Sequence, residues 1–323
     1  MYRPPVTITP VMLKFSENIF REIGRLEGVK MVSPSVVLRR SNKIKTVHAS
    51  LAIEGNTLTI EHITDLLEGK RVIGPVKDIL EVKNALVLYE KLQDFDPLSI
   101  NDLLQAHKIL MQGLIEGNGH FRTSGVGILK GTEVVHVAPP AKKVPDLMQD
   151  LFDFINQDQD LSWLLKSCIF HFEFEFIHPF IDGNGRMGRL WQQLLLMKEH
   201  TVFAFIPVEE LIKENQARYY DVLEKSGKAG ESTIFVEFIL EIILASLIKY
   251  GTEIFARPND PLSRLEYAKQ SLSKDWFVRR DYLSIHPDIS MPTASRDLIF
   301  GVKQNVLIST GQKNQVRYRF VVE

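Results

Sequence analysis

The stretch His178-Pro179-Phe180-Ile181-Asp182-Gly183-Asn184-Gly185-Arg186-Met187-Gly188-Arg189 decides how the centre of this chain folds. Before it, residues 161–177 are apolar nearly all round, which is typical of a central helix buried by its neighbours. Pro179 disfavours helical backbone at the residue before it, so this helix should end at His178. The imidazole of His178 would then stand at the mouth of a loop.

The loop after His178 can bring several backbone N–H groups together. Gly183 and Gly185 supply freedom for positive φ angles, which lets successive N–H groups converge. A second helix is predicted over 186–198, and its N-terminus adds unpaired N–H groups and the positive end of the helix dipole. This segment therefore predicts an anion site.

Charged and titratable side chains surround the predicted anion site. Arg186 and Arg189 are three residues apart, so both project from the same side of the first helical turn. Asp182 is a hard carboxylate, the type of ligand that Mg²⁺ uses together with substrate phosphates. His178 can act as a base, since an unperturbed imidazole titrates near about pH 6.5. The combination indicates phosphoryl or nucleotidyl transfer.

This stretch resembles the Fic signature, His-x-Phe-x-Asp/Glu-Gly-Asn-Gly-Arg-x-x-Arg, at every fixed position, and the similarity extends over most of residues 11–250. The resemblance implies that His178 is the general base for a Ser, Thr or Tyr hydroxyl of a target protein, and that Phe180 is a buried anchor. Asp182 would bind Mg²⁺ on the α- and β-phosphates of ATP, and Arg189 would hold the γ-phosphate. The nucleotide would also be bound by Gly183, Asn184, Gly185 and Arg186, of which the last three would form an anion hole.

One position separates two reactions within the family. The kinase-like Doc branch has a lysine where this chain has Gly185, and that lysine inverts the bound nucleotide. Gly185 therefore implies transfer of AMP rather than of phosphate.

Ahead of this segment, Ser50-Leu51-Ala52-Ile53-Glu54-Gly55-Asn56 resembles the inhibitory motif of the family, Ser/Thr-x-x-x-Glu-Gly/Asn. Its position is similar to that in the class with an N-terminal inhibitory helix. A carboxylate can accept two hydrogen bonds from a guanidinium fork, and the γ-phosphate of ATP requires the same fork of Arg189. Glu54 is therefore expected to keep the enzyme nearly silent. In the plainer alternative, Glu54 is only an acid at the end of a helix.

Two further segments match parts of the family pattern. Residues 125–137 predict a β-hairpin, similar to the flap that holds the target segment by strand addition, with Val134, Val135 and His136 as contact positions. The alternative is a surface hairpin without function. Tyr219 and Tyr220 resemble the tyrosine pair that helps to form the adenine pocket. Some relatives carry an asparagine where this chain has Gly227, so the adenine contacts have less support than the phosphate contacts.

We predict a mainly α fold, in which a Fic-type helical core carries a small β-hairpin flap and is followed by a winged helix-turn-helix domain. Residues 1–84 would form the N-terminal helical region with the inhibitory helix, 85–255 the catalytic domain and 262–323 the winged-helix domain. The other predicted helices cover residues 11–26, 34–51, 78–92, 99–114, 144–156, 208–225, 234–248, 263–272 and 293–305, and a terminal hairpin covers 306–309 and 316–322.

The C-terminal region allows two interpretations. As a DNA reader it would use Thr293, Ser295 and Arg296 early in its recognition helix, with a wing that carries Lys313, Arg317 and Arg319. As a protein-contact or dimerisation module it would need none of these on DNA. The local net charge of +4 over 261–323 does not decide between them, and we favour the protein-contact interpretation slightly.

Composition narrows the class of protein. Hydrophobic residues make up 45% of the 323 residues and the formal net charge is −1, values of an ordinary globular chain. A single cysteine, Cys168, excludes an internal disulfide and fits the cytoplasm. We expect no membrane segment, since the most apolar stretch, 234–248, is shorter than the roughly 20 residues that a bilayer requires. A zinc site is not predicted, because the spacing of the possible ligands does not suit tetrahedral coordination. These ligands are Cys168, His171, Glu173, Glu175 and His178.

The sequence therefore predicts a Mg²⁺- and ATP-dependent protein adenylyltransferase, a nucleotidyltransferase restrained by Glu54. One alternative is a DNA-binding regulator whose core senses nucleotide without transferring it. Another is removal of AMP from modified proteins, with Glu54 positioning a water. A homodimer is implied by the family resemblance alone.

Overall fold

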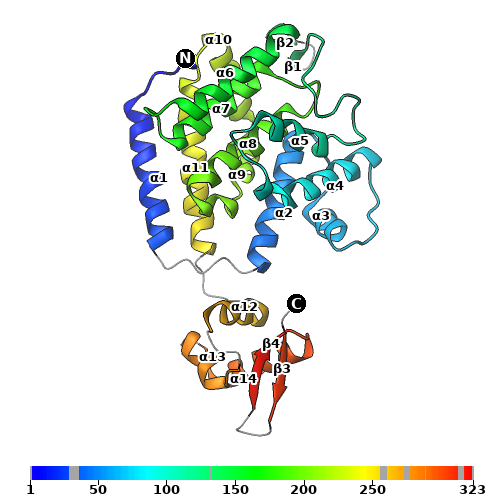
Figure 1. Cartoon of the computed structure of the whole chain (residues 1–323), viewed down its shortest axis with the longest axis vertical. Coiled ribbons are helices and arrows are strands. Elements are labelled where there is room, and N and C mark those ends of the chain that lie inside the picture. The colour runs from blue at the N-terminus through cyan, green and yellow to red at the C-terminus, as the bar shows by residue number, and fades with distance from the viewer. Residues whose placement is uncertain are drawn as a thin grey trace. The chain divides into compact units, whose positions relative to one another are not determined.

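Helices form most of the residues that the structure describes, and these residues also include two short antiparallel hairpins (Figure 1). The computed structural model describes residues 2–28, 36–130, 133–254, 260–272, 276–287, 289–311 and 316–321. The chain divides into two compact units, one within residues 1–27 and 42–251 and the other within 28–41 and 252–323. The predicted fold class, mainly α with a small hairpin, is confirmed.

The first unit contains the elements that carry the predicted site. Its helices are α1 (Pro10–Gly28), α2 (Val36–Ile53), α3 (Ile60–Leu67), α4 (Val76–Glu90), α5 (Ile100–Leu110), α6 (Val144–Gln157), α7 (Trp163–Ile177), α8 (Asn184–Glu199), α9 (Val208–Glu214), α10 (Gln216–Ala229) and α11 (Thr233–Ile254).

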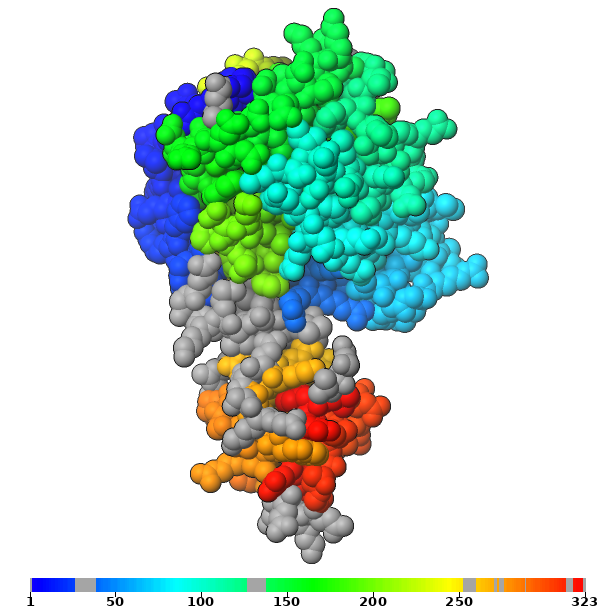
Figure 2. Space-filling view, in the orientation of Figure 1, coloured from blue at the N-terminus to red at the C-terminus, as the bar shows by residue number. Residues whose placement is uncertain are grey.

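Helix α7 lies at the centre of the first unit, as its apolar composition predicts. Thirteen of its side chains are buried, and the Ser162 hydroxyl caps its N-terminus by accepting from the Leu165 N–H. Helix α8 packs along α7, and the other helices surround the pair (Figure 1). In the space-filling view of the same face, the cyan and green segments form one continuous surface (Figure 2). Because α7 and α8 pack against each other, the segment that joins them is held at both ends.

The predicted hairpin is formed by β1 (Gly127–Lys130) and β2 (Glu133–Val137), which pair antiparallel. Gly127 lies opposite Val137, and the register shifts between Ile128 and Leu129. Such a shift marks a bulge, which bends and twists a ribbon.

The helix predicted over 208–225 is wrong, because two helices stand in its place. The backbone leaves helical geometry at Asn215, whose side-chain amide donates to the Leu211 carbonyl and closes the end of α9. Asparagine favours such local bonds over a helix interior. Helix α3 was not predicted either, because its eight residues are too few to show a clear period. Within the described ranges, no helix is both long and apolar enough to cross a bilayer.

The second unit has its own hydrophobic core. Helices α12 (Pro261–Ser271), α13 (Arg279–Ile285) and α14 (Met291–Lys303) precede strands β3 (Leu307–Thr310) and β4 (Arg317–Phe320). Phe277 forms a backbone bridge with Tyr318 that extends the hairpin by one short segment. The core comprises Leu265, Ala268, Phe277, Tyr282, Ala294, Leu298 and Leu307. The predicted order of helices and a terminal hairpin is present, whereas α13 was not predicted.

Candidate active site

His178 ends α7 in a conformation that few residues adopt. Its φ of 51° lies in the left-handed region, and its N–H donates to the Phe174 carbonyl as the helix closes. A non-glycine residue in this region stores strain, which is common at functional sites. The ring Nδ1 lies 3.3 Å from the Glu175 carbonyl, so Nδ1 carries the proton and Nε2 is the basic nitrogen. Pro179 thus ends the helix where the sequence predicts.

The loop after His178 is held from inside by Phe180. The ring of Phe180 is fully buried and stacks on His107 of α5, with 3.6 Å between the ring centroids. The Asn184 side-chain amide accepts from the Phe180 N–H at 2.8 Å and donates to the Phe180 carbonyl at 2.9 Å. The Asn184 side chain therefore closes the loop, and only its backbone N–H is available to the predicted anion hole.

The two glycines of the loop act in different ways. Gly183 has a φ of +86° and forms the N-cap of α8, as predicted from its conformational freedom. Gly185 has no positive φ, because α8 begins at Asn184 instead of Arg186, and this part of the prediction is wrong. Gly185 is needed for space, since a Cβ there would collide with the Glu54 carboxylate.

Arg186 is buried and bridges two carboxylates. It donates to Glu81 Oε1 of α4 and to Asp182 Oδ1, each at 3.0 Å. The Asp182 side chain is 43% exposed and also accepts the Gly183 N–H at 2.6 Å. Asp182 is therefore accessible beside the N-terminus of α8, where a single carboxylate fits an ion that takes its other ligands from phosphates and water.

Arg189 is occupied by the C-terminal end of α2. Its Nη2 donates to Glu54 Oε1 at 2.8 Å and to the Ser50 carbonyl at 2.9 Å, and its Nε donates to Ser50 Oγ at 3.3 Å. The Arg189 side chain is 1% exposed. Burial alone would lower the pKa of Arg189, but the negative charge of Glu54 and the hydrogen bond to it raise this pKa well above its usual range. The guanidinium is charged and bound to the predicted inhibitory segment.

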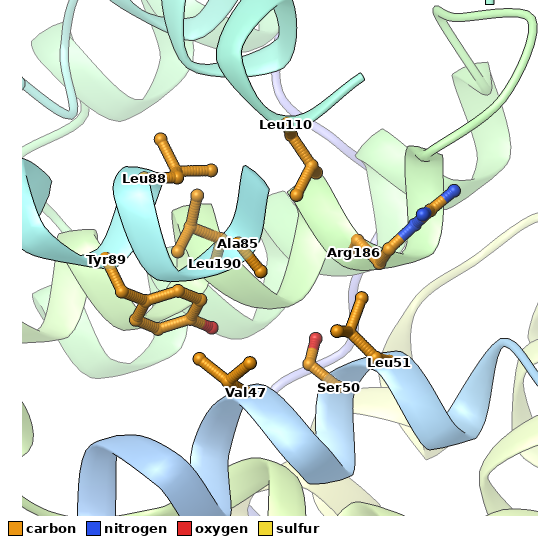
Figure 3. Close-up of a pocket in the computed structure, with 9 residues that line it drawn as sticks. All are labelled: Val47, Ser50, Leu51, Ala85, Leu88, Tyr89, Leu110, Arg186 and Leu190. Carbon is orange, nitrogen blue, oxygen red and sulfur yellow. The ribbon is translucent and has the colours of Figure 1, made fainter. Parts of the chain in front are cut away.

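Helix α2 is fixed in this position at both its face and its end. Gly55, with a φ of +90°, turns the chain, and Asn56 donates to Glu81 Oε2 at 2.8 Å. A small cavity lies among α2, α4, α5 and α8, and Figure 3 shows its mainly apolar lining. The lining residues are Val47, Ser50, Leu51, Ala85, Leu88, Tyr89, Leu110, Arg186 and Leu190. Glu81 of α4 therefore accepts hydrogen bonds both from Asn56, just after α2, and from Arg186.

The two predicted adenine contacts differ in exposure. Tyr219 is buried, and its hydroxyl donates to His171 Nε2 at 3.0 Å. Tyr220 is 41% exposed, and its hydroxyl donates to the Ile53 carbonyl at the end of α2. Only Tyr220 therefore offers surface to a ligand. The side chains of Val134, Val135 and His136 lie outside the described part of the chain.

Three residues that hold the loop were not found from sequence. Arg122 is buried and donates to the carbonyls of His178 at 2.7 Å and Pro139 at 2.6 Å. His107 Nδ1 accepts the Gly119 N–H, so its Nε2 donates to the Asp182 carbonyl at 3.0 Å. Burial lowers the pKa of His107 to about 4, which keeps this ring neutral. Glu81 is the third. No local motif marks these residues, because each bonds across the fold.

Comparison with known proteins identifies the family. Residues 97–196 match the family model described as Fic/DOC. The crystal structure of a Fic family protein from Desulfovibrio desulfuricans G20 is 38% identical, with a TM-score of 0.74 over 100% of this chain and 99% of that chain. The chain belongs to the Fic family.

Curated relatives of this Fic protein carry an activity in their names. Protein adenylyltransferase fic-1 of Caenorhabditis elegans is 27% identical over 75% of this chain and 48% of its own length. Protein adenylyltransferase Fic of Drosophila willistoni is 30% identical over 66% of this chain and 43% of its own length. The chain thus spans about half the length of these relatives. A solved structure of residues 134–508 of C. elegans Fic-1, 24% identical with a TM-score of 0.62, shares the fold over 76% of this chain and 74% of that one.

One buried acid of this Fic protein predicts a dependence of stability on pH. Glu175, one turn before His178, is buried, and burial raises its pKa from 4.5 to about 8. Between these values the unfolded chain has lost the proton that the folded chain keeps, so the free energy of unfolding falls as the pH rises. Each such group changes the free energy of unfolding by about 1.4 kcal/mol per pH unit at most.

We therefore expect Glu175→Gln to flatten the loss of stability between pH 6.5 and 8. Denaturant unfolding of the variant and of wild type at several pH values measures the difference. The exposed Glu116, changed to Gln, is the matched control and should retain the wild-type slope. Equal slopes for Glu175→Gln and wild type would contradict the prediction. The buried His171, whose pKa burial lowers to about 3, titrates in the opposite sense but only below about pH 6.5.

Proposed function

We propose that this chain is a protein adenylyltransferase, a nucleotidyltransferase that moves AMP from ATP to a hydroxyl group of a target protein and releases pyrophosphate. The observation that carries the proposal is the joint placement of His178, Asp182 and Arg189 around the N-terminus of α8. The names of the curated relatives give it further support.

In the proposed reaction, His178 Nε2 takes the proton of the target hydroxyl. The hydroxyl oxygen forms a bond to the α-phosphorus of ATP, and the bond from that phosphorus to the bridging oxygen breaks. The N–H groups at the start of α8 and the Arg186 guanidinium stabilise the negative charge on the phosphate oxygens. The Glu175 carbonyl holds the imidazole in the tautomer that can accept the proton.

The proposal assigns Mg²⁺ to Asp182, the accessible carboxylate beside the phosphate site. A bound Mg²⁺ would neutralise charge on the α- and β-phosphates. Arg186 keeps the Asp182 carboxylate in place by its bond at 3.0 Å. Tyr220 is the proposed contact for the adenine ring, and the β1–β2 hairpin is the proposed binding segment for the target chain.

The resting structure corresponds to a restrained enzyme in this proposal. Glu54 occupies the fork of Arg189 that the γ-phosphate would use, and Gly185 provides the space for the Glu54 carboxylate. We further propose residues 1–84, 85–255 and 262–323 as the functional divisions, a winged-helix character for the last, a homodimer as the assembly and the cytoplasm as the location.

Transfer of differently labelled ATP tests the reaction. With the Glu54→Gly variant in a cell lysate, label from α-³²P ATP should appear on protein above the level given by Glu54→Gly with His178→Ala, and label from γ-³²P ATP should not exceed that level. The reverse pattern would establish a kinase and overturn the proposal. Absence of label from both would oppose it as well, once binding of ATP by the same variant has been verified.

A further inference from the structure

Positive charge is concentrated in the C-terminal part of the chain. Residues 261–323 contain ten Lys or Arg against six Asp or Glu, a net charge of +4, whereas the whole chain has −1. The preceding residues therefore carry −5. This asymmetry of charge alone does not distinguish a DNA partner from a protein partner, so the positions of the basic side chains on the second unit decide between them.

The second unit presents α14 in the manner of a DNA-reading helix. Helix α13 is followed after a short connection by α14, and the two pack together with α12 on one core (Figure 1). In helix-turn-helix proteins, the second of two such helices enters the major groove of DNA. The β3–β4 hairpin follows α14 directly, which is the place of a wing.

The outward face of α14 consists of Pro292, Arg296, Ile299 and Lys303, spaced four, three and four residues apart. All four side chains are exposed, and Ile299 is 54% exposed. The one acid in α14, Asp297, is 1% exposed on the opposite side. Arg264 neutralises it with two hydrogen bonds of 2.6 and 2.8 Å. The outward face therefore presents basic and apolar groups without a carboxylate.

Two other arginines extend this basic surface within the same unit. Arg279, at the start of α13, is exposed and donates to Ser295 Oγ of α14 at 2.9 Å. This bond ties the N-terminus of α13 to α14. Arg317 is exposed at the start of β4. Cations are thus available from α13 and β4 as well as from α14.

We propose that the second unit binds double-stranded DNA through the outward face of α14. Arg296 and Lys303 contact phosphates or guanine edges, and Ile299 supplies an apolar contact to a thymine methyl group. A protein partner fits this face less well. The centres of protein interfaces are depleted of lysine, whereas here Lys303 lies one turn from Ile299 on the same face. This binding is independent of the proposed AMP transfer.

The test uses the full chain and fluorescein-labelled 30-base-pair duplexes of randomised sequence. Fluorescence anisotropy measures the affinity at several salt concentrations. Wild type should bind with a Kd on the order of 10⁻⁶ to 10⁻⁴ M near physiological salt. The double variant Arg296→Ala, Lys303→Ala should bind at least about tenfold more weakly, and its plot of log K against log salt should be shallower by roughly 2.

Two further double variants distinguish binding by the outward face of α14 from attraction of DNA by positive charge anywhere on the chain. Lys142→Ala with Lys143→Ala removes the same charge from exposed positions of the first unit and should leave DNA binding unchanged. Arg296→Lys with Lys303→Arg keeps the charge and should retain most of the binding. Thermal unfolding of each variant checks that the second unit remains folded.

Three outcomes would overturn the proposal. The first is no binding of duplex by wild type at about 50 mM salt, where electrostatic binding is strong. The second is an equal loss of binding in the α14 and Lys142/Lys143 double variants. The third is self-association that Ile299→Asp abolishes while no DNA is bound, because the face would then contact a second copy of the chain.

Discussion

Glu54→Gly is expected to raise the rate of AMP transfer by roughly 10- to 100-fold, since hydrogen bonds to charged groups contribute about 1.5–3 kcal/mol. The bond from Arg189 Nη2 to Glu54 Oε1 is 2.8 Å long, and water screens it only from the side of Glu54, because Arg189 is 1% exposed and Glu54 33% exposed. Without the carboxylate, the Arg189 fork can turn to the γ-phosphate. Initial rates of transfer from α-labelled ATP measure the effect.

Graded variants distinguish loss of this contact from a general loosening of α2. Glu54→Gln keeps the length of the side chain but replaces a charge-assisted bond with a weaker neutral one, so an intermediate rate is expected. Glu116→Gly introduces the same residue at an exposed position outside α2 and should leave the rate at the wild-type level. If Glu54→Gly transfers no faster than wild type while binding ATP equally well, the proposed restraint is wrong.

The sequence predicts the local features of the site because their causes are local. Pro179 ends α7 at His178, and Gly183 forms the αL cap of α8, as the preferences of proline and glycine require. The pairing of Glu54 with Arg189 was expected from the two motifs, although 135 residues separate them. The structure provides the geometry of that contact.

The features that the sequence analysis missed depend on packing. Arg122 and Glu81 look like ordinary surface charges in the sequence, yet both are buried and bond to groups far along the chain. The space that Gly185 provides for Glu54 is equally invisible without the position of α2. Short helices such as α3 and α13, with eight and seven residues, give too little periodicity to be recognised.

The second large expected effect is a loss of AMP transfer when His178 is replaced. Removal of a positioned general base lowers a rate by about 10²- to 10⁴-fold. In the Glu54→Gly background, His178→Ala should therefore reduce AMP transfer to this extent. The affinity for ATP should change little, because the phosphate contacts come from α8 and Arg189.

The left-handed backbone of His178 decides which variant is the sharper test. Alanine is poorly suited to a φ of 51°, whereas asparagine adopts this region more readily and lacks a basic nitrogen. His178→Asn should thus keep the stability of the parent and lose the same activity as His178→Ala. Retention of more than about a tenth of the parent rate by a folded, ATP-binding His178→Asn variant would contradict the assignment of His178 as the base, because the loss would then fall short of the general-base range.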